Sequence, residues 1–119
     1  MPTLFKNATS SNIGIIPTEV LTTDSGNQFT IIGLNLANTT SSMIQVNVVL
    51  KTWTPDISGN NETLVSTGNI LRNIMIPPQS SLKAITNGEK LIIAKNNSLE
   101  VSSNAPNSVD SVISYVEIL

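Results

Sequence analysis

Several stretches of the chain alternate between apolar and polar residues with a period of two, which is the pattern of β-strands. In residues 43–54 four apolar side chains fall on one face, Ile44, Val46, Val48 and Leu50, and the polar Gln45, Asn47 and Lys51 fall on the other. This alternation predicts a half-buried antiparallel strand. Residues 109–118 alternate in the same way but carry β-branched residues on both faces, so we expect a well-buried strand there.

Residues 28–37 form a third predicted strand, which contains Gly33. One face would carry Thr30, Ile32, Leu34 and Leu36, and the other Phe29, Ile31, Gly33 and Asn35. A glycine within such a run indicates a bulge or the close approach of another backbone.

Turn-forming residues divide residues 73–119 into short apolar runs. Asn87-Gly88 lies between two such runs, and Asn-Gly favours a type I′ hairpin because both central positions need a positive φ. Asn96-Asn97 and residues 104–107 mark further breaks. We therefore expect a meander of four short strands that begins after Pro77-Pro78, with the upstream chain packed against it.

The remaining apolar runs predict shorter strands. These are residues 3–8, 13–16, 19–23, 62–67 and 68–76. In the last, Ile70, Leu71, Ile74 and Met75 would also suit one or two helical turns, but Gly68 before them and Pro77 after them favour an extended segment. Residues 3–8 would instead be an N-terminal arm if nothing packs on Leu4 and Phe5. No amphipathic stretch of 11 or more residues with caps occurs, so little or no helix is expected.

Short strands separated by turn signals at intervals of about 8–12 residues are typical of a sandwich or small barrel. The chain has 119 residues, which is enough to bury a core without disulfides. We predict one all-β domain over residues 1–119, an antiparallel β-sandwich with jelly-roll or immunoglobulin-like topology. Residues 1–8 are its strand or N-terminal arm.

The composition argues against catalysis and against several kinds of ligand. The chain has no histidine and no cysteine, which removes Ser–His–Asp and Cys–His nucleophilic sites and zinc sites with nitrogen or sulfur ligands. The net charge is −2, so no basic footprint for nucleic acid is expected. No apolar run approaches the ~20 residues of a membrane span, and no secretory signal is visible. We expect no enzyme activity, no cofactor, no metal site and no membrane partner.

Two polar turns carry oxygen ligands that Ca²⁺ could use. Residues 24–27 form one, and the other has alternating Asp56, Ser58, Asn60 and Glu62. Neither has the spacing of an EF-hand loop, and the side chains of such turns commonly cap their own backbone. We therefore interpret both as polar turns.

The surface predicted by this composition is polar but poorly charged. Asn, Ser and Thr account for 43 residues, whereas charged residues make up only 12%, about half the usual fraction of roughly 25%. Removing water from such a surface costs less than removing it from charges. The composition therefore suits close contact with neighbouring proteins, and an AT-rich genome is the alternative source of the same bias.

Six residues are candidates for protein contacts. Four of them are apolar residues near the chain ends, where a monomer would fray: Leu4, Phe5, Ile118 and Leu119. The others are Trp53 and Tyr115, which could anchor an interface or stack on a sugar, with a place in the core as the alternative.

From about residue 28 onward the chain resembles small virion structural proteins of tailed bacteriophages, especially those of phages of cyanobacteria and other marine bacteria. The matching residues are 33–38 (GLNLAN), 76–82 (IPPQSSL), 88–92 (GEKLI) and 98–104 (SLEVSSN), followed by Ser108, Val109, Asp110, Ser114, Glu117 and Ile118. Gln79 departs from the pattern where a glycine is commoner, and Asn96-Asn97 departs where Gly-Asp is commoner.

The resemblance implies a non-enzymatic structural protein present in many copies. It implies binding to itself as a homo-oligomer and to major capsid, neck or tail proteins, as a capsid decoration or cement protein or a neck, collar or tail component. The protein would be made in the cytoplasm of the bacterial host and located in the virion. The pattern holds no catalytic or ligand residues, so none is carried over.

A carbohydrate- or receptor-binding β-sandwich, with or without Ca²⁺, is the alternative. Such a module would carry exposed aromatic side chains in a shallow groove, and an aromatic content of 3% argues against it.

Overall fold

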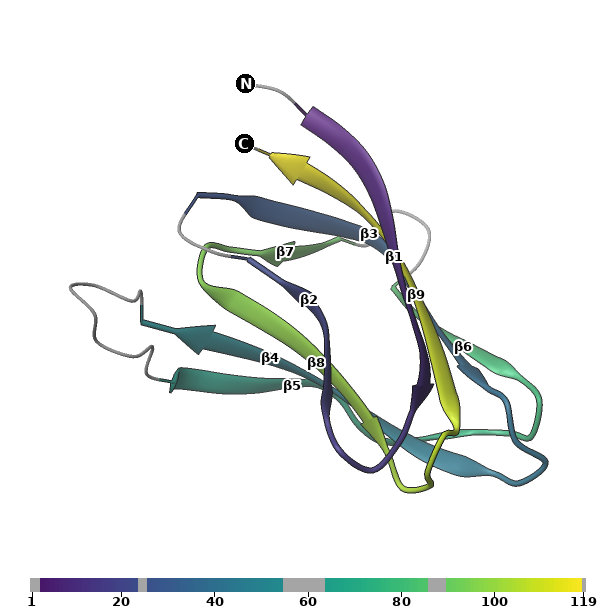
Figure 1. Cartoon of the computed structure of the whole chain (residues 1–119). Coiled ribbons are helices and arrows are strands. Elements are labelled where there is room, and N and C mark those ends of the chain that lie inside the picture. The colour runs from purple at the N-terminus through teal and green to yellow at the C-terminus, as the bar shows by residue number, and fades with distance from the viewer. Residues whose placement is uncertain (1–2, 24–25, 55–63, 86–89, 119) are drawn as a thin grey trace.

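A computed structural model describes residues 3–23, 26–54, 64–85 and 90–118, in which every regular element is a β-strand (Figure 1). The strands are β1 (Thr3–Ile13), β2 (Thr18–Thr22), β3 (Gln28–Asn38), β4 (Ile44–Trp53), β5 (Leu64–Ile76), β6 (Ser81–Ile85), β7 (Leu91–Ile93), β8 (Asn97–Ser103) and β9 (Val109–Ile118). Within these ranges no helix is long and apolar enough to cross a bilayer.

The strands form two antiparallel sheets packed as a sandwich. The first has the order β1-β9-β3-β6, with β7 also beside β3, and the second has the order β2-β8-β4-β5. Strands of the first half thus pair with strands of the second half in reverse order: β1 with β9, β2 with β8, β3 with β6 and β7, and β4 with β5. One long hairpin rolled up in this way is a jelly roll. The predicted β-sandwich is confirmed, with the first of its two expected topologies.

The predicted meander of residues 73–119 is wrong. β6 and β7 do not pair with each other, because both run antiparallel to β3 along successive parts of its length. The chain then crosses to the other sheet at β8 and returns at β9. Asn87-Gly88 itself lies outside the described residues. The hairpin signal was local, whereas β3, distant in sequence, supplies the hydrogen-bonding partner for both flanking strands.

A β-bulge in β3 changes which of its residues are buried. Ile31 pairs with Tyr115 and Gly33 with Ser114, so Ile32 is an extra residue in the strand. The bulge predicted at Gly33 is therefore confirmed. Before the bulge the odd-numbered Phe29 and Ile31 are buried, and after it the even-numbered Leu34 and Leu36 are buried. The single alternation expected across residues 28–37 is wrong, because an inserted residue shifts the period-two pattern to the other face.

Two other boundaries differ from expectation. Residues 3–8 belong to a strand, β1, which continues to Ile13 and pairs with β9 along its length. Ile13 is thus the end of β1, and the strand expected at residues 13–16 is mostly the loop 14–17. The extended interpretation of residues 68–76 is confirmed, since they continue the single strand β5.

Both sheets contribute to the core. Its fully buried side chains include Ile31, Leu34, Leu36, Val46, Val48, Leu99, Val101 and Ile113. Ile44, Val46 and Val48 face inward as expected, and Leu50 is partly buried. In β9 only one face is buried. The other face, which includes Val112, is open to solvent. The prediction that this strand is buried on both faces is therefore wrong for a single copy of the chain.

The loops 14–17, 39–43, 77–80 and 104–108 gather at one end of the sandwich, here called the loop end (Figure 1). The buried side chain of Asn38 connects two of them. Its amide lies within hydrogen-bonding distance of the carbonyl oxygens of Ser42 (2.7 Å), Ile76 (3.1 Å) and Pro77 (3.1 Å). Its oxygen accepts from the backbone N–H and the hydroxyl of Thr40. One side chain therefore satisfies polar backbone groups from both the β3–β4 and β5–β6 connections.

Among the described residues, positive φ angles occur at five positions other than glycine: Asn12, Asn73, Asn96, Asn107 and Gln79. Four of the five are asparagines, the residue type that tolerates this region best after glycine. The high asparagine content thus has a backbone role in turns and bulges.

Gln79, at φ 52°, lacks that tolerance. We expect Gln79→Gly to raise the free energy of unfolding by about 1 kcal/mol, because the left-handed conformation costs glycine no steric strain. Urea denaturation of the variant and of the wild type measures this change. Ser80→Gly, at the neighbouring exposed position with negative φ, is the control and is expected to give no gain. A stability for Gln79→Gly at or below that of the wild type would contradict the prediction.

Candidate assembly surfaces

The outer face of the sheet formed by β1, β9, β3, β6 and β7 is rich in exposed apolar side chains, and we call it the A face. A transverse row crosses four of these strands, since Phe5 pairs with Val116, Val116 with Thr30, and Thr30 with Ile92. Phe5 is 79% exposed and Ile92 63%, at the two edges of the row. Val112 and Ile32 add further exposed apolar area on the inner strands, at 44% and 40%.

Polar residues on the A face are mostly uncharged. Asn7, Thr9 and Ser114 lie between the apolar side chains. Among the described residues of this face, Lys83 and Asp110 carry charge, and both lie toward the loop end. Asp110 also accepts a hydrogen bond from the Asn12 backbone N–H at 3.0 Å. Most of the A face can therefore lose its water at little electrostatic cost.

A hollow of about 300 Å³ opens on the A face beside the bulge. Its lining includes Ile32, Gly33, Lys83, Val112 and Ser114. The bulge displaces Ile32 from the regular pleat, and Gly33 leaves the adjacent position without a side chain. The bulge thus gives an otherwise open sheet face a recess.

The outer face of the β2-β8-β4-β5 sheet, here called the B face, is different. Glu19 lies opposite Glu100, and Glu100 forms an ion pair with Lys51 at 3.0 Å. Trp53 lies over this sheet and donates its indole N–H to the Ser98 hydroxyl at 2.9 Å. Charges and satisfied polar groups occupy β2, β8 and β4 on this face, whereas the edge strand β5 carries exposed apolar side chains, among them Val65 at 61% and Met75 at 59%. The B face is therefore more charged than the A face, although it also has exposed apolar area.

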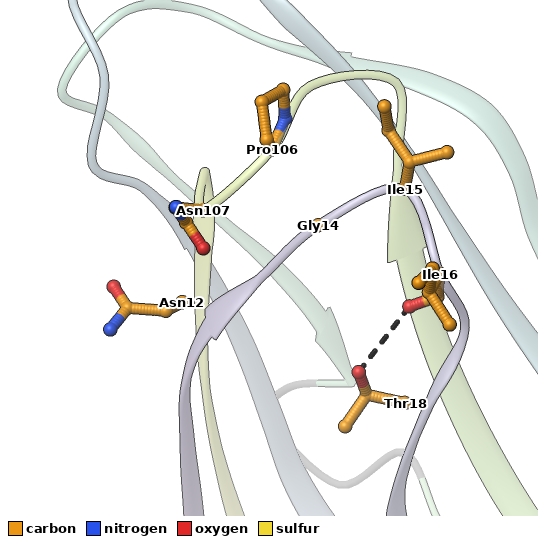
Figure 2. Close-up of a pocket in the computed structure, with 7 residues that line it drawn as sticks. All are labelled: Asn12, Gly14, Ile15, Ile16, Thr18, Pro106 and Asn107. Atoms are coloured by element: carbon orange, nitrogen blue, oxygen red, sulfur yellow. Dashed lines mark hydrogen bonds between the residues drawn. The ribbon is translucent and has the colours of Figure 1, made fainter.

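A second apolar feature lies at the loop end. A hollow of about 520 Å³ is lined by Asn12, Gly14, Ile15, Ile16, Thr18, Pro106 and Asn107 (Figure 2). Ile15 and Ile16 are 61% and 80% exposed. Neither isoleucine is among the contact residues predicted from the sequence. The sequence does contain a signal for this exposed apolar surface, since Ile15 and Ile16 are adjacent and Pro17 follows them. Only one of two neighbouring residues on a half-buried strand can face the core, so at least one isoleucine had to lie outside it.

The loop carrying these isoleucines is held firmly against the 104–107 loop. Gly14 accepts a hydrogen bond from the Ser103 N–H, and Ile13 accepts one from the Ser108 N–H, both at 2.9 Å. Ser108 in turn donates its hydroxyl to the Ala105 carbonyl at 2.8 Å. The exposed isoleucines therefore extend from a fixed backbone.

The six predicted contact residues lie in different environments. Leu4 and Phe5 are exposed on β1, and Ile118 is half-buried at the end of β9. Trp53 is half-buried on the B face. Tyr115 is buried against Phe29, with ring centroids 4.7 Å apart, which is the core alternative left open by the sequence. Leu119 lies outside the described residues.

Of the described side chains among these six, the register places Phe5 and Ile118 on the A face, whereas Leu4, Trp53 and Tyr115 lie elsewhere. The candidate Ca²⁺ turn at residues 56–62 also lies outside the described ranges. Within them, no cluster of three or more His, Cys, Asp or Glu side chains could hold a metal ion.

An ion pair joins the two terminal strands. The Lys6 ammonium lies 2.5 Å from the Glu117 carboxylate, which also accepts a hydrogen bond from the Asn27 side-chain amide at 3.1 Å. The hydrogen bond from Lys6, followed by that from Asn27, lowers the pKa of Glu117 below its usual value. The same hydrogen bond raises the pKa of Lys6.

These shifts predict how the stability depends on acid. A carboxylate whose pKa is lower in the folded state stabilises the fold above its unfolded pKa, and this stabilisation is lost as the pH falls through the folded pKa. We expect the free energy of unfolding of the wild type to fall between about pH 6 and pH 3 more steeply than that of Glu117→Gln. Urea denaturation at several pH values measures both. A constant difference between the two proteins over this range would contradict the role given to Glu117.

No protein-family model matches this chain, and no curated protein sequence matches it significantly. Among solved structures, a chain of the T13 particle of infectious bursal disease virus matches with a TM-score of 0.54 and 12% identity. VP2 of the subviral particle of the same virus matches with a TM-score of 0.51 and 11% identity. A chain from Bacillus endospore appendages, which are disulfide-linked pili, has a TM-score of 0.46 and 8% identity, with 97% of this chain and 86% of that chain covered.

The two viral matches cover 97% of this chain but only 30% and 36% of the viral chains, so this chain spans about a third of their length. At these identities the likeness is one of fold. The structural neighbours include viral capsid proteins, and the fold of this chain is one that viral structural proteins use.

Proposed function

We propose that this chain is a non-enzymatic structural protein of a tailed-bacteriophage virion, present in many copies. It binds other copies of itself and other virion proteins, as a capsid decoration or cement protein or as a neck, collar or tail component. The observation that carries this proposal is the pair of separate apolar surfaces, the A face and the loop end, on a jelly roll. A protein built into a particle needs contacts to more than one neighbour, and monomers rarely expose such patches without a partner.

The backbone conformation supports the resemblance to phage proteins. Gln79 and Asn96 stand where the resembling proteins more commonly carry a glycine, and both have positive φ angles, of 52° and 59°. A glycine at either position would adopt this conformation without strain. Because the departures from the pattern fall where the backbone favours glycine, the chain and the phage proteins are expected to share these turns.

The copy number of this chain in purified virions tests the proposed function. Virions purified from the phage that encodes this chain would be analysed by quantitative mass spectrometry, with the major capsid protein as the internal reference. We expect a copy number that is a simple multiple of a symmetric ring or capsid lattice. Absence of the chain from washed, infectious particles would overturn the proposal.

A carbohydrate- or receptor-binding module remains the second candidate, favoured by the hollow at the loop end. Its apolar lining of Ile15, Ile16 and Pro106 lacks the aromatic platforms on which sugars stack. A glycan array, probed with and without Ca²⁺, separates the two functions. Specific binding that Ile16→Ser abolishes would favour the second candidate.

A further inference from the structure

We infer that the A face binds the A face of a second copy of this chain around a two-fold axis. This inference deepens the proposed function, and it rests on that function only for the expectation that many copies meet in one place. It assigns one of the two apolar surfaces to self-association. The loop end is then left for a different neighbour.

The area of the A face is sufficient for a specific but modest dimer. β1, β9 and β3 are 10 or 11 residues long, and β6 and β7, of five and three residues, together form a fourth row beside β3. At about 4.8 Å spacing these four rows cover about 600 Å². Two such faces bury about 1,200 Å², near the lower limit for specific interfaces. We therefore expect a dimer that forms reversibly in the micromolar range or above, since interfaces of this size are commonly weak.

The charges of the A face favour a second copy of the same chain. A two-fold contact brings each patch against itself, so a patch with a strong net charge would repel its copy. The charged residues described on the A face are one lysine, Lys83, and one aspartate, Asp110, both near the loop end. The B face, in contrast, has Glu19 and Glu100 directly opposite each other. In a self-contact of the B face Glu100 would keep its ion pair with Lys51, but Glu19, which has no ion-pair partner among the described residues, would lose its water without compensation.

The shape of the A face also favours a second copy of this chain as its binding partner. Phe5 protrudes at one edge, with most of its ring surface exposed, and the hollow beside Gly33 lies on the inner strands. In a two-fold contact the protruding residue of each copy can pack into the recess of the other copy, so the same contact forms twice.

Single-cysteine cross-linking tests the pairing, because the natural chain has no cysteine. Ser114 is exposed on β9 near the middle of the A face, where a central two-fold axis brings it close to its own copy. We expect Ser114→Cys, treated with a short bismaleimide, to give a covalent dimer. Ser102→Cys, on the B face near the end of β8, is the control and should give at least about tenfold less dimer. Labelling with a monofunctional maleimide checks that both cysteines are accessible.

A second pair of variants ties the dimer to the A face. Ile92→Lys in the Ser114→Cys background places an unpaired ammonium in the contact and should reduce the cross-linked dimer by at least about tenfold. Asn69→Lys adds the same charge to an exposed site on β5 and should leave cross-linking unchanged. Circular dichroism and thermal melting establish that each variant is folded.

The cross-linking results show whether the A faces of two copies pair, independently of the proposed function. Equal cross-linking at Ser114→Cys and Ser102→Cys, or undiminished cross-linking after Ile92→Lys, would overturn it. If the chain is abundant in virions but Ser114→Cys does not cross-link, the pairing is wrong and the proposed function stands. If cross-linking succeeds but the chain is absent from virions, the proposed function fails and the paired A face stands.

Discussion

Replacing Asn38 by alanine is expected to lower the free energy of unfolding by about 3 kcal/mol, because it leaves buried polar groups without partners. The amide lies within hydrogen-bonding distance of three backbone carbonyls, and its oxygen accepts two hydrogen bonds from Thr40. Truncation leaves a void that water fills poorly at a buried position. Both loops that Asn38 connects would loosen.

A companion variant separates the donor from the acceptor role of Asn38. Asn38→Asp keeps the oxygen that Thr40 contacts but aims a second, charged oxygen at the carbonyls of Ser42, Ile76 and Pro77. We expect it to be less stable than Asn38→Ala at pH 7 and to recover partly in acid, where a protonated carboxyl donates again. Urea denaturation measures both variants. Asn69→Ala, an exposed asparagine on β5, is the control. Losses below about 1 kcal/mol for both variants would show that Asn38 does not connect the loops.

Gly14→Ala is expected to cost about 2 kcal/mol, more than the same change at Gly33 or Gly68, where an added Cβ meets no atom closer than 3.8 Å. A Cβ at this position would lie 3.1 Å from the backbone nitrogen of Asn107 and 3.2 Å from the Cα of Pro106. Both contacts are to backbone atoms, so the 104–107 loop must move. That movement would strain the hydrogen bond from the Ser103 N–H to Gly14.

Gly68→Ala is the matched control for Gly14→Ala. Its Cβ would meet the Leu50 carbonyl oxygen at 4.0 Å, an ordinary contact. We expect its stability to lie within about 0.5 kcal/mol of the wild type. Denaturant unfolding distinguishes the two glycines, and equal losses at both would mean that close packing at the loop end is not the cause.

The long strands could be predicted from the sequence because their burial is regular. In β4 the core face follows the period of two from Ile44 through Val48, and this part was predicted correctly. In β3 the same rule failed at one residue, because Ile32 is inserted opposite β9. The glycine signalled the bulge, but a bulge also reverses the faces after it, and the sequence alone does not say which side the insertion occupies.

The order of strands depended on contacts that local signals do not contain. Asn-Gly between two apolar runs favours a hairpin, yet β6 and β7 each pair with β3 instead. In a jelly roll the partner of each strand is set by the rolling of the whole chain, and most neighbours in space are distant in sequence. Turn residues therefore located the strand ends better than they located the strand pairs.

The candidate surfaces were only partly visible in the sequence. Phe5 was singled out because it lies near a chain end, whereas its significance in the structure comes from its row with Val116 and Ile92. Burial on both faces was expected for β9, and its outer face is instead exposed. A β-branched outer face that the chain itself does not cover is what a strand buried by a second copy would show, and this is the physical link between that failed expectation and the paired A face.

Sedimentation equilibrium of the purified wild-type chain over a wide concentration range tests most directly whether this protein is built to bind its own copies. We expect the measured mass to rise reversibly with concentration, from the 12.7 kDa of one chain toward twice that value. The midpoint of this rise should lie between about 1 and 100 µM, as expected for an interface of this size. A mass of one chain at every concentration up to about 500 µM would contradict it.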